Sequence, residues 1–298
     1  MRLIAASPFT PRWEPLAPRE VGPGEVRVQT RLSALSVASE LSVLQGGPFP
    51  SPLGYQTLGT VTAAGPGVTL PVGARVVTTL GHAAWGVHGA ARVIPVPDDV
   101  PDRAALSVIL AEETAKGLRR VQPAPHERVL VAGAGLLGLL SVVNLTRAGV
   151  HDVSVIEPRA DRQALARQFG AREVYAPQDA PSDAFDVGVE CSAAPAGFAA
   201  LLGALRPCGR CVVLSDGNWG ALTLTPDFHR KELSVVASSD GEDYAAHARW
   251  WWRHVSPVLE AMYPLTVAAT DLPGLYARLD SPDRPVSVLV DWEMTPLL

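Results

Sequence analysis

Between residues 20 and 100, apolar and polar positions alternate in short runs that glycine and proline interrupt. These runs are EVRVQTRLSAL, LGTVTAAG, ARVVTTLG and AARVIPVP. Strict alternation gives a strand one apolar face and one polar face, so this part of the chain predicts a compact β domain. The pattern then changes, because residues 105–120 predict a helix and are followed by the proline-containing link VQPAPHE.

After that link, short apolar runs alternate with amphipathic stretches. The predicted strands are RVLVAGA, DVSVIEP, REVYAP, FDVGVECS, RCVVLSDG and ELSVVASS, and the predicted helices are 136–147, 161–169 and 196–205. Strands that alternate with helices form parallel sheets covered on both faces. Right-handed crossovers then predict a doubly wound α/β domain.

The C-terminal part predicts one helix over residues 243–262, followed by the strand PVSVLVDW, which we expect to return to the first domain. The helix carries the run Trp250-Trp251-Trp252. Successive helical side chains point about 100° apart, so the three indoles cannot all face one core. At least one is expected to be half exposed or buried in a subunit contact.

Composition narrows the class of protein. The chain has 298 residues, of which 47% are hydrophobic, enough for more than one core. A net charge of −5 argues against a nucleic-acid surface, and no apolar run predicts a signal peptide or a membrane span. Cys191, Cys208 and Cys211 complete neither a disulfide framework nor a zinc tetrad, although a Cys208/Cys211 redox pair stays open. We expect a cytoplasmic protein that acts on a small molecule.

The motif VLVAGAGLLGLL places Gly133, Gly135 and Gly138 in the GxGxxG spacing between a predicted strand and a predicted helix. In this context Gly133 allows the tight turn, Gly135 lets the backbone approach a pyrophosphate, and Gly138 lets helix and strand pack closely. The helix begins at Leu136 and Leu137, where free N–H groups and the positive dipole end favour an anion. The motif therefore predicts dinucleotide binding; a glycine-rich packing motif is the alternative.

Glu157 ends the next predicted strand. A carboxylate there accepts a hydrogen bond from the ribose 2′-OH and repels a 2′-phosphate, so NAD(H) is favoured over NADP(H). Arg159 and Arg162 point the other way, since either could approach a phosphate.

Other polar residues follow the predicted strands. Cys191-Ser192 and Ser215-Asp216 stand at carboxyl ends, where a doubly wound sheet binds its ligand, although simple turn chemistry is the alternative. The adjacent pair Glu112-Glu113 predicts a solvated helix face, because neighbouring helical side chains diverge.

Over essentially its full length the chain resembles the medium-chain dehydrogenase/reductase superfamily, the fold of the zinc alcohol dehydrogenases. The resemblance is carried by the glycine motif together with LGTVTAAGPGV, GARVV, RQALARQFGAREV, FDVGVECSAAPAGFAALLGALRPCGRCVVLSDG and HRKELSVVAS. It implies a GroES-like catalytic β domain at 1–112, completed by 264–298, and a Rossmann dinucleotide-binding domain at 113–263.

The resemblance also implies where a catalytic zinc would lie. The family's Cys-Gly-Ser/Thr-Asp segment is here Val37-Ala38-Ser39-Glu40, its His-Glu pair is Tyr55-Gln56, and its third ligand falls near Leu110. None of these matches a zinc ligand set, so no metal is expected. The segment SALSVASELSVLQG is most similar to the zinc-free branch that has a Ser-x-Gly-Thr-Glu type motif and includes a bacteriochlorophyllide dehydrogenase, with Ala38-Ser39 in place of Gly-Thr.

Without zinc, hydrogen-bond donors or an already electrophilic substrate, such as an enone or quinone, must replace the polarisation of a carbonyl. The candidate donors are Tyr55, Ser39 and a loop histidine, His82 or His88. The resemblance places Tyr55 toward the nicotinamide and matches Ser39 to a proton-relay hydroxyl; a space-filling tyrosine is the alternative. It also places Thr114 beside the nicotinamide, where a helix-interior hydroxyl is the alternative.

The sequence thus predicts a zinc-independent oxidoreductase that transfers a hydride between NAD(H) and a small or medium carbonyl or alcohol. The alternative is a nucleotide-binding redox sensor that has lost catalysis. The resemblance further implies a homodimer, paired through ELSVVASS as the edge strand of the cofactor domain.

Overall fold

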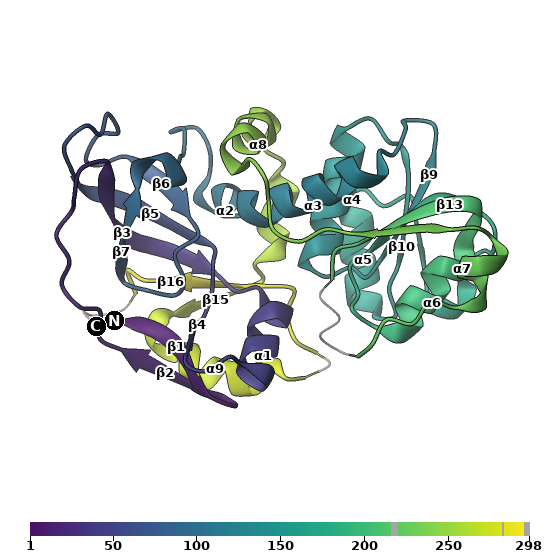
Figure 1. Ribbon diagram of the computed structural model, residues 1–298, viewed down its shortest axis with the longest axis horizontal. Helices are drawn as coiled ribbons and strands as arrows, with labels where there is room; N and C mark the ends of the chain where they lie inside the picture. The colour runs from purple at the N-terminus through teal and green to yellow at the C-terminus, as the bar shows by residue number, and fades with distance from the viewer. Residues whose placement is uncertain (216–219, 282, 295–298) are drawn as a thin grey trace. The chain divides into compact units, whose positions relative to one another are not determined.

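The computed structural model describes residues 1–215, 220–281 and 283–294. The chain divides into two compact units (Figure 1). Unit 1 comprises Met1–Ile109 and Tyr244–Leu298, and unit 2 comprises Leu110–Asp243. Residues 244–263, which the sequence assigned to the dinucleotide-binding domain, therefore pack within unit 1.

Unit 1 is rich in β structure. Its larger sheet has seven strands in the order β15-β16-β3-β5-β6-β8, with β7 also paired with β3. Their bounds are β3 Glu25–Ala34, β5 Thr57–Ala64, β6 Arg75–Thr78, β7 Trp85–Gly89, β8 Ile94–Pro95, β15 Leu265–Ala268 and β16 Val288–Asp291. A three-stranded sheet contains β2 (Thr10–Glu14), β1 (Arg2–Ser7) and β4 (Ser51–Pro52). β16 runs antiparallel to β3, which confirms the return of the C-terminal strand to the first domain.

The helices of unit 1 are short. They are α1 (Val37–Gly46), α2 (Asp102–Leu106), α8 (Tyr244–Trp251) and α9 (Leu272–Leu279), with 3₁₀ segments at Ala90–Arg92, Trp252–His254, Pro257–Met262 and Ala269–Asp271. The single helix predicted over 243–262 is wrong. Pro257 starts a new 3₁₀ segment, and Ser256 before it is extended, as expected of a residue that precedes proline.

The tryptophan run divides as expected. Trp251 is fully buried and donates through Nε1 to Ser107 Oγ at 2.8 Å, and Trp252 is also buried. Trp250 remains 37% exposed. The expectation that one indole would be left half exposed is confirmed.

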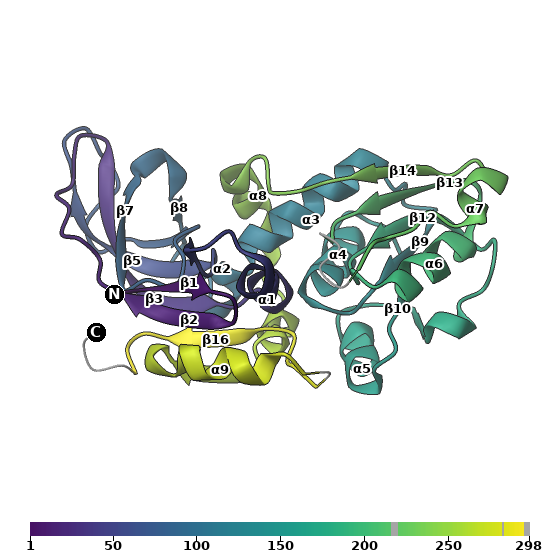
Figure 2. The same ribbon diagram turned by 60° about the horizontal axis from the view of Figure 1, so that its bottom comes forward.

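Unit 2 is a doubly wound parallel sheet in the order β11-β10-β9-β12-β13-β14, as predicted (Figure 2). Its strands are β9 Arg128–Ala132, β10 Asp152–Ile156, β11 Glu173–Tyr175, β12 Phe185–Glu190, β13 Leu205–Val213 and β14 Ser234–Ala237. Its helical segments are α3 Val108–Val121, which enters from unit 1, α4 Leu136–Arg147, α5 Ala160–Gln168, 3₁₀ Pro177–Asp179, α6 Pro195–Ala204 and α7 Pro226–Arg230.

The strand order reverses between β9 and β12. The chain moves from β9 through α4 toward β10 on one side, and from β12 through α6 toward β13 on the other. Right-handed crossovers in opposite directions place α4 and α6 on opposite faces of the sheet. Residues at the carboxyl ends of β9 and β12 therefore lie at the switch point, where such sheets bind ligands.

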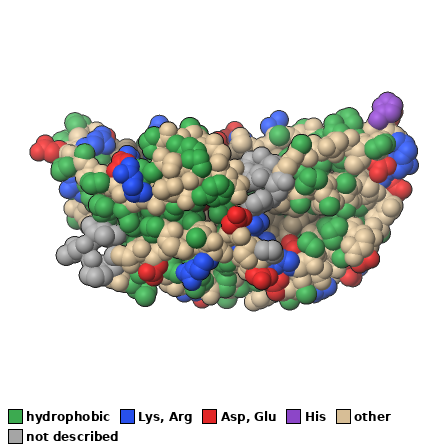
Figure 3. All heavy atoms as spheres, turned by 90° about the horizontal axis from the view of Figure 1, so that it is seen from below, with side chains coloured by type: hydrophobic (Ala, Val, Ile, Leu, Met, Phe, Trp, Pro, Cys, Tyr) green, Lys and Arg blue, Asp and Glu red, His purple; other side chains and the backbone are tan. Residues whose placement is uncertain are grey.

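Acidic and basic side chains are interspersed on the face drawn in Figure 3. Among the described residues, no helix is long and apolar enough to cross a bilayer.

Candidate functional site

The turn between β9 and α4 requires glycine at two positions. Gly133 has φ +94°, and a Cβ there would lie 2.9 Å from Ser192 Cα. A Cβ on Gly138 would lie 1.9 Å from the carbonyl oxygen of Gly133. The first glycine therefore permits the turn and the third permits close contact between turn and helix, as their spacing predicts.

The middle glycine is open. A Cβ on Gly135 would meet only Arg162 Nη1, at 3.9 Å. Gly135 also precedes the first turn of α4, where Leu136 and Leu137 lie and where no side chain caps the helix. An accessible backbone at a helix N-terminus, with a guanidinium beside it, fits the pyrophosphate of a dinucleotide.

Glu157 is buried beside this turn, directly after β10. Its Oε2 accepts from the Ala134 N–H at 2.9 Å and its Oε1 from the Arg159 N–H at 3.0 Å. The Arg159 side chain pairs with Asp161 at 2.6 Å, whereas Arg162 approaches Gly135. The carboxylate is thus fixed at the strand end from which a ribose would be recognised.

The carboxyl end of β12 holds a buried carboxylate, Glu190. Its Oε1 accepts from the Ser192 N–H at 2.6 Å, the Ser192 hydroxyl at 2.7 Å and the Ala193 N–H at 2.8 Å. Burial raises the pKa of Glu190, and the hydrogen bonds from Ser192 and Ala193 oppose the rise. Glu190 therefore holds the loop that packs against Gly133.

Two cysteines near Glu190, Cys191 and Cys211, have raised thiol pKa values, so they are poor nucleophiles. Cys191 lies beside Ser141, and burial, followed by the charge of Glu190, raises the pKa of its thiol. Cys211 is buried in β13 with its pKa raised in the same way, while Cys208 is exposed, and all three cysteines are free. A redox pair needs a low-pKa thiol, so these positions weigh against one.

Ser215 lies in the described part of the chain, and Asp216 lies outside the described residues. Thr114 is fully buried inside α3; it donates to Ala111 O at 2.9 Å and accepts from Asn144 Nδ2 at 2.7 Å. This environment matches the helix-interior alternative rather than a surface beside a nicotinamide.

The solvated face expected for Glu112 is wrong. Glu112 is buried and accepts from Arg119 Nη2 at 2.8 Å and from the N–H groups of Glu242 and Asp243 at 3.2 Å each. Its role in the described structure is to tie α3 to the segment after β14.

In unit 1, three side-chain hydroxyls form a row of neighbouring contacts in space. The Tyr55 OH lies 3.5 Å from Ser39 Oγ, which lies 3.2 Å from Ser36 Oγ. Ser36 precedes α1 and Ser39 lies in its first turn. Gln56, beside Tyr55, is buried, and neither of its amide atoms has a hydrogen-bond partner within the described residues.

The positions implied for a catalytic zinc do not fit that metal. Val37, Tyr55, Gln56 and Leu110, which stand at the ligand positions, offer no thiolate, imidazole or carboxylate. Glu40, at the acidic end of the first segment, is buried, and its carboxylate accepts from Ser36, His82 and Tyr276. Across the described ranges, no group of three histidine, cysteine or acidic residues is placed to hold a metal ion.

His82 is enclosed rather than presented to a substrate. It is 1% exposed, its Nδ1 lies 2.8 Å from Ser33 Oγ and its Nε2 lies 3.0 Å from Glu40 Oε2. Because both ring nitrogens already contact protein groups, we assign His82 no role as a hydrogen-bond donor to a substrate. His88 lies on β7, where burial and then the charge of Arg19 lower its pKa.

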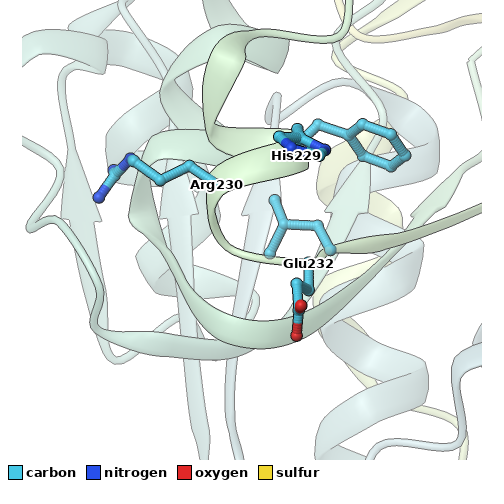
Figure 4. Close-up of a pocket in the computed structure, with 5 residues that line it drawn as sticks. His229, Arg230 and Glu232 are labelled. Atoms are coloured by element: carbon cyan, nitrogen blue, oxygen red, sulfur yellow. The ribbon is translucent and has the colours of Figure 1, made fainter.

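A surface hollow lies elsewhere in unit 2, lined by Phe228, His229, Arg230, Glu232 and Leu233 (Figure 4). These residues precede β14, so they lie at the amino ends of the parallel strands, whereas the glycine turn lies at the carboxyl ends. Arg230 pairs with Asp227. The hollow is therefore separate from the candidate cofactor site.

Sequence reasoning missed Glu190 and Glu40 as individual residues. Both are acids within apolar runs, FDVGVECS and SALSVASELSVLQG, and an acid in such a run is a signal, because a buried carboxylate needs donors around it. Which donors surround each acid could not be read from the pattern.

No protein-family model matches the chain. The chain is 27% identical over 252 residues to an L-threonine 3-dehydrogenase of Mesorhizobium japonicum, a match that covers 67% of this chain and 72% of that protein. It is 35% identical over 98 residues to the L-threonine 3-dehydrogenase of Pectobacterium carotovorum, covering 30% of this chain and only 29% of that protein.

Solved structures share the fold. A 2R,3R-butanediol dehydrogenase from Bacillus subtilis superimposes with a TM-score of 0.83 at 19% identity, covering 97% of this chain and 99% of that chain. An acetophenone reductase from Geotrichum candidum, solved with NAD, gives 0.84 at 21% identity and covers 97% and 96%. The fold expected from the resemblance is thereby confirmed.

Proposed function

We propose that this protein is an oxidoreductase that transfers a hydride between a nicotinamide cofactor and a small or medium carbonyl or alcohol. The glycine turn carries the proposal: Gly133 and Gly138, where a Cβ would meet backbone atoms at 2.9 and 1.9 Å, flank an open backbone at Gly135, at the switch point of a doubly wound sheet. The likeness to dehydrogenases, one of them solved with NAD, supports it. When bound, the nicotinamide would supply or accept the hydride.

We further propose that NAD(H) is preferred. Glu157 is held by two backbone N–H groups beside the turn, where its charge would repel a 2′-phosphate. Arg159 is already paired with Asp161, which reduces its reach toward a phosphate.

The proposal assigns no step to zinc, because the residues at the implied ligand positions do not fit the metal. In its place Tyr55 would donate to the developing oxyanion, with Ser39 as the next hydroxyl in a proton path. A phenol polarises a carbonyl less than zinc does, which favours conjugated, electrophilic substrates such as enones and quinones.

The test is a paired titration of the purified protein with NADH and NADPH, followed by tryptophan-to-nicotinamide energy transfer, with metal content assayed on the same sample. We expect tighter binding of NADH by metal-free protein, and then oxidation of NADH by a panel of enones and quinones. Binding of neither cofactor would refute the proposal. Binding without turnover of any carbonyl would favour the redox-sensor alternative, for which the absence of zinc-type ligands at the implied positions is the supporting observation.

A homodimer through β14 is proposed as well. β14 is the edge strand of the sheet in unit 2, with β13 as its only sheet neighbour among the described strands. Pairing two such edges about a two-fold axis would satisfy their open backbone groups. Sedimentation at micromolar concentration should show a dimer, and a monomer would overturn this proposal.

A further inference from the structure

A carboxylate in unit 1, that of Glu40, is buried at the centre of a hydrogen-bond network. It is 2% exposed. Its Oε1 accepts from the Ser36 N–H at 2.8 Å, and its Oε2 accepts from His82 Nε2 at 3.0 Å and from the Tyr276 hydroxyl. A buried carboxylate is costly unless donors surround it, and here three donors do.

The directions of these hydrogen bonds can be assigned by starting from Trp292, whose indole N–H can only donate. Its Nε1 lies 2.9 Å from Ser33 Oγ. When the Ser33 hydroxyl in turn donates to His82 Nδ1, the imidazole proton lies on Nε2, which donates to Glu40 Oε2. In this arrangement both oxygens of the carboxylate are acceptors.

Glu40 forms hydrogen bonds with the start of α1 through both its backbone and its side chain. Its N–H donates to Ser36 O at 3.0 Å, while its carboxylate accepts from the Ser36 N–H. Ser36 is the residue that precedes the helix, and no side-chain cap of its own fixes it. Both peptide groups of Ser36 are thus held by one residue through its N–H and its Oε1, whereas its Oε2 faces His82 and Tyr276 of α9.

This arrangement determines where the hydroxyls lie. Ser36 Oγ is 3.2 Å from Ser39 Oγ, which is 3.5 Å from the Tyr55 OH. We propose that Glu40 is a positioning residue, which fixes the first turn of α1 so that the hydroxyls of Ser36 and Ser39 stay in line with the Tyr55 phenol. The inference rests on the proposed function, because it gives Glu40 a part in proton delivery to the substrate oxygen.

Glu40→Gln is the discriminating variant, because it keeps the shape and replaces one acceptor by an NH₂ group. Whichever way the amide turns, that NH₂ group faces a donor, either the Ser36 N–H or the pair formed by His82 and Tyr276. Tyr276→Phe is the matched control. It removes one buried hydrogen bond to the same carboxylate but leaves the contact between Glu40 and Ser36 intact.

Both variants are compared with the wild type by NADH titration, by thermal unfolding, by hydrogen exchange of residues 36–46, and by kcat and KM for NADH oxidation with cyclohexenone and benzoquinone. A misplacement of about 1 Å costs about 10²-fold in rate, so Glu40→Gln should lose kcat on that scale with KM within about threefold. Tyr276→Phe should keep kcat within about threefold of wild type, even where its melting temperature falls equally. NADH affinity should be unchanged in both, because the glycine turn belongs to unit 2.

A Glu40→Gln protein with wild-type kcat, or a Tyr276→Phe protein with the same loss of kcat, would overturn the inference. A wild-type protein that turns over neither carbonyl would count against the proposed function instead. Hydrogen exchange then decides the positioning role: faster exchange of residues 36–46 in Glu40→Gln alone supports it, and equal exchange in both variants overturns it.

Discussion

Gly138→Ala tests the packing of the glycine turn most directly. The new Cβ would lie 1.9 Å from the carbonyl oxygen of Gly133 and 3.0 Å from its carbonyl carbon. An ordinary C···O contact is about 3.3 Å, so the turn and the helix must separate by about 1.4 Å. The clash is with backbone, which cannot rotate away, so the cost belongs at the upper end of the overpacking range, about 3 kcal/mol. That corresponds to a fall of roughly 6–12 °C in melting temperature.

Gly135→Ala is the matched control. Its Cβ would meet nothing closer than Arg162 Nη1 at 3.9 Å, so stability should change by less than about 0.5 kcal/mol. The methyl group would, however, stand where the pyrophosphate approaches. Loss of one charge-assisted hydrogen bond, about 1.5–3 kcal/mol, would weaken NADH binding by roughly 10- to 150-fold.

The two variants are measured by thermal unfolding and by NADH titration. We expect Gly138→Ala to lose both stability and affinity, and Gly135→Ala to lose affinity alone. Wild-type stability of Gly138→Ala would refute the packing argument. Wild-type NADH affinity of Gly135→Ala would show that the dinucleotide does not use this turn.

The other predictions concern single side chains. Tyr55→Phe should lower kcat for carbonyl reduction by about 10²-fold or more without changing NADH affinity, and a kcat equal to wild type would remove Tyr55 as the donor. Burial raises the pKa of Glu112, but hydrogen bonds from Arg119 and two backbone N–H groups outweigh it and hold the pKa below 4.5. Its charge therefore contributes stability above pH 4.5 that is lost on acidification, and urea unfolding of Glu112→Gln should show less of this acid loss than wild type. Burial raises the pKa of Glu190 above the ordinary value of 4.5, so ionisation of Glu190 lowers the stability of the fold, opposite to Glu112. Wild type should lose stability relative to Glu190→Gln as the pH rises above the ordinary pKa of a glutamate, and parallel pH profiles would contradict this.

The local sequence pattern was sufficient to predict most of the helices and strands of unit 2. The helix predicted over 136–147 is α4 with the same bounds, because the glycine motif marks its start and an apolar face continues along it. The parallel order of the strands follows from their alternation with helices. Even the roles of Gly133 and Gly138 could be derived, since the conformation of a tight turn depends on the residues within it.

Prediction failed where a contact joins distant parts of the chain. Glu112 was expected on a solvated face, but Arg119 and the segment after β14 enclose it. The prediction of one helix over 243–262 failed for a local reason instead: Pro257 starts a new 3₁₀ segment and Ser256 before it is extended.

The sequence by itself determined the fold class and the glycine turn, because these depend on residue types and on neighbours along the chain. Only the tertiary structure decided the role of His82, which changes from a candidate donor to a buried partner of Glu40. Residues 40, 82, 276 and 292 meet in one network through different elements. Their hydrogen bonds exist only after folding has brought those elements together and excluded water, and no periodicity along the chain encodes which donor will face which acceptor.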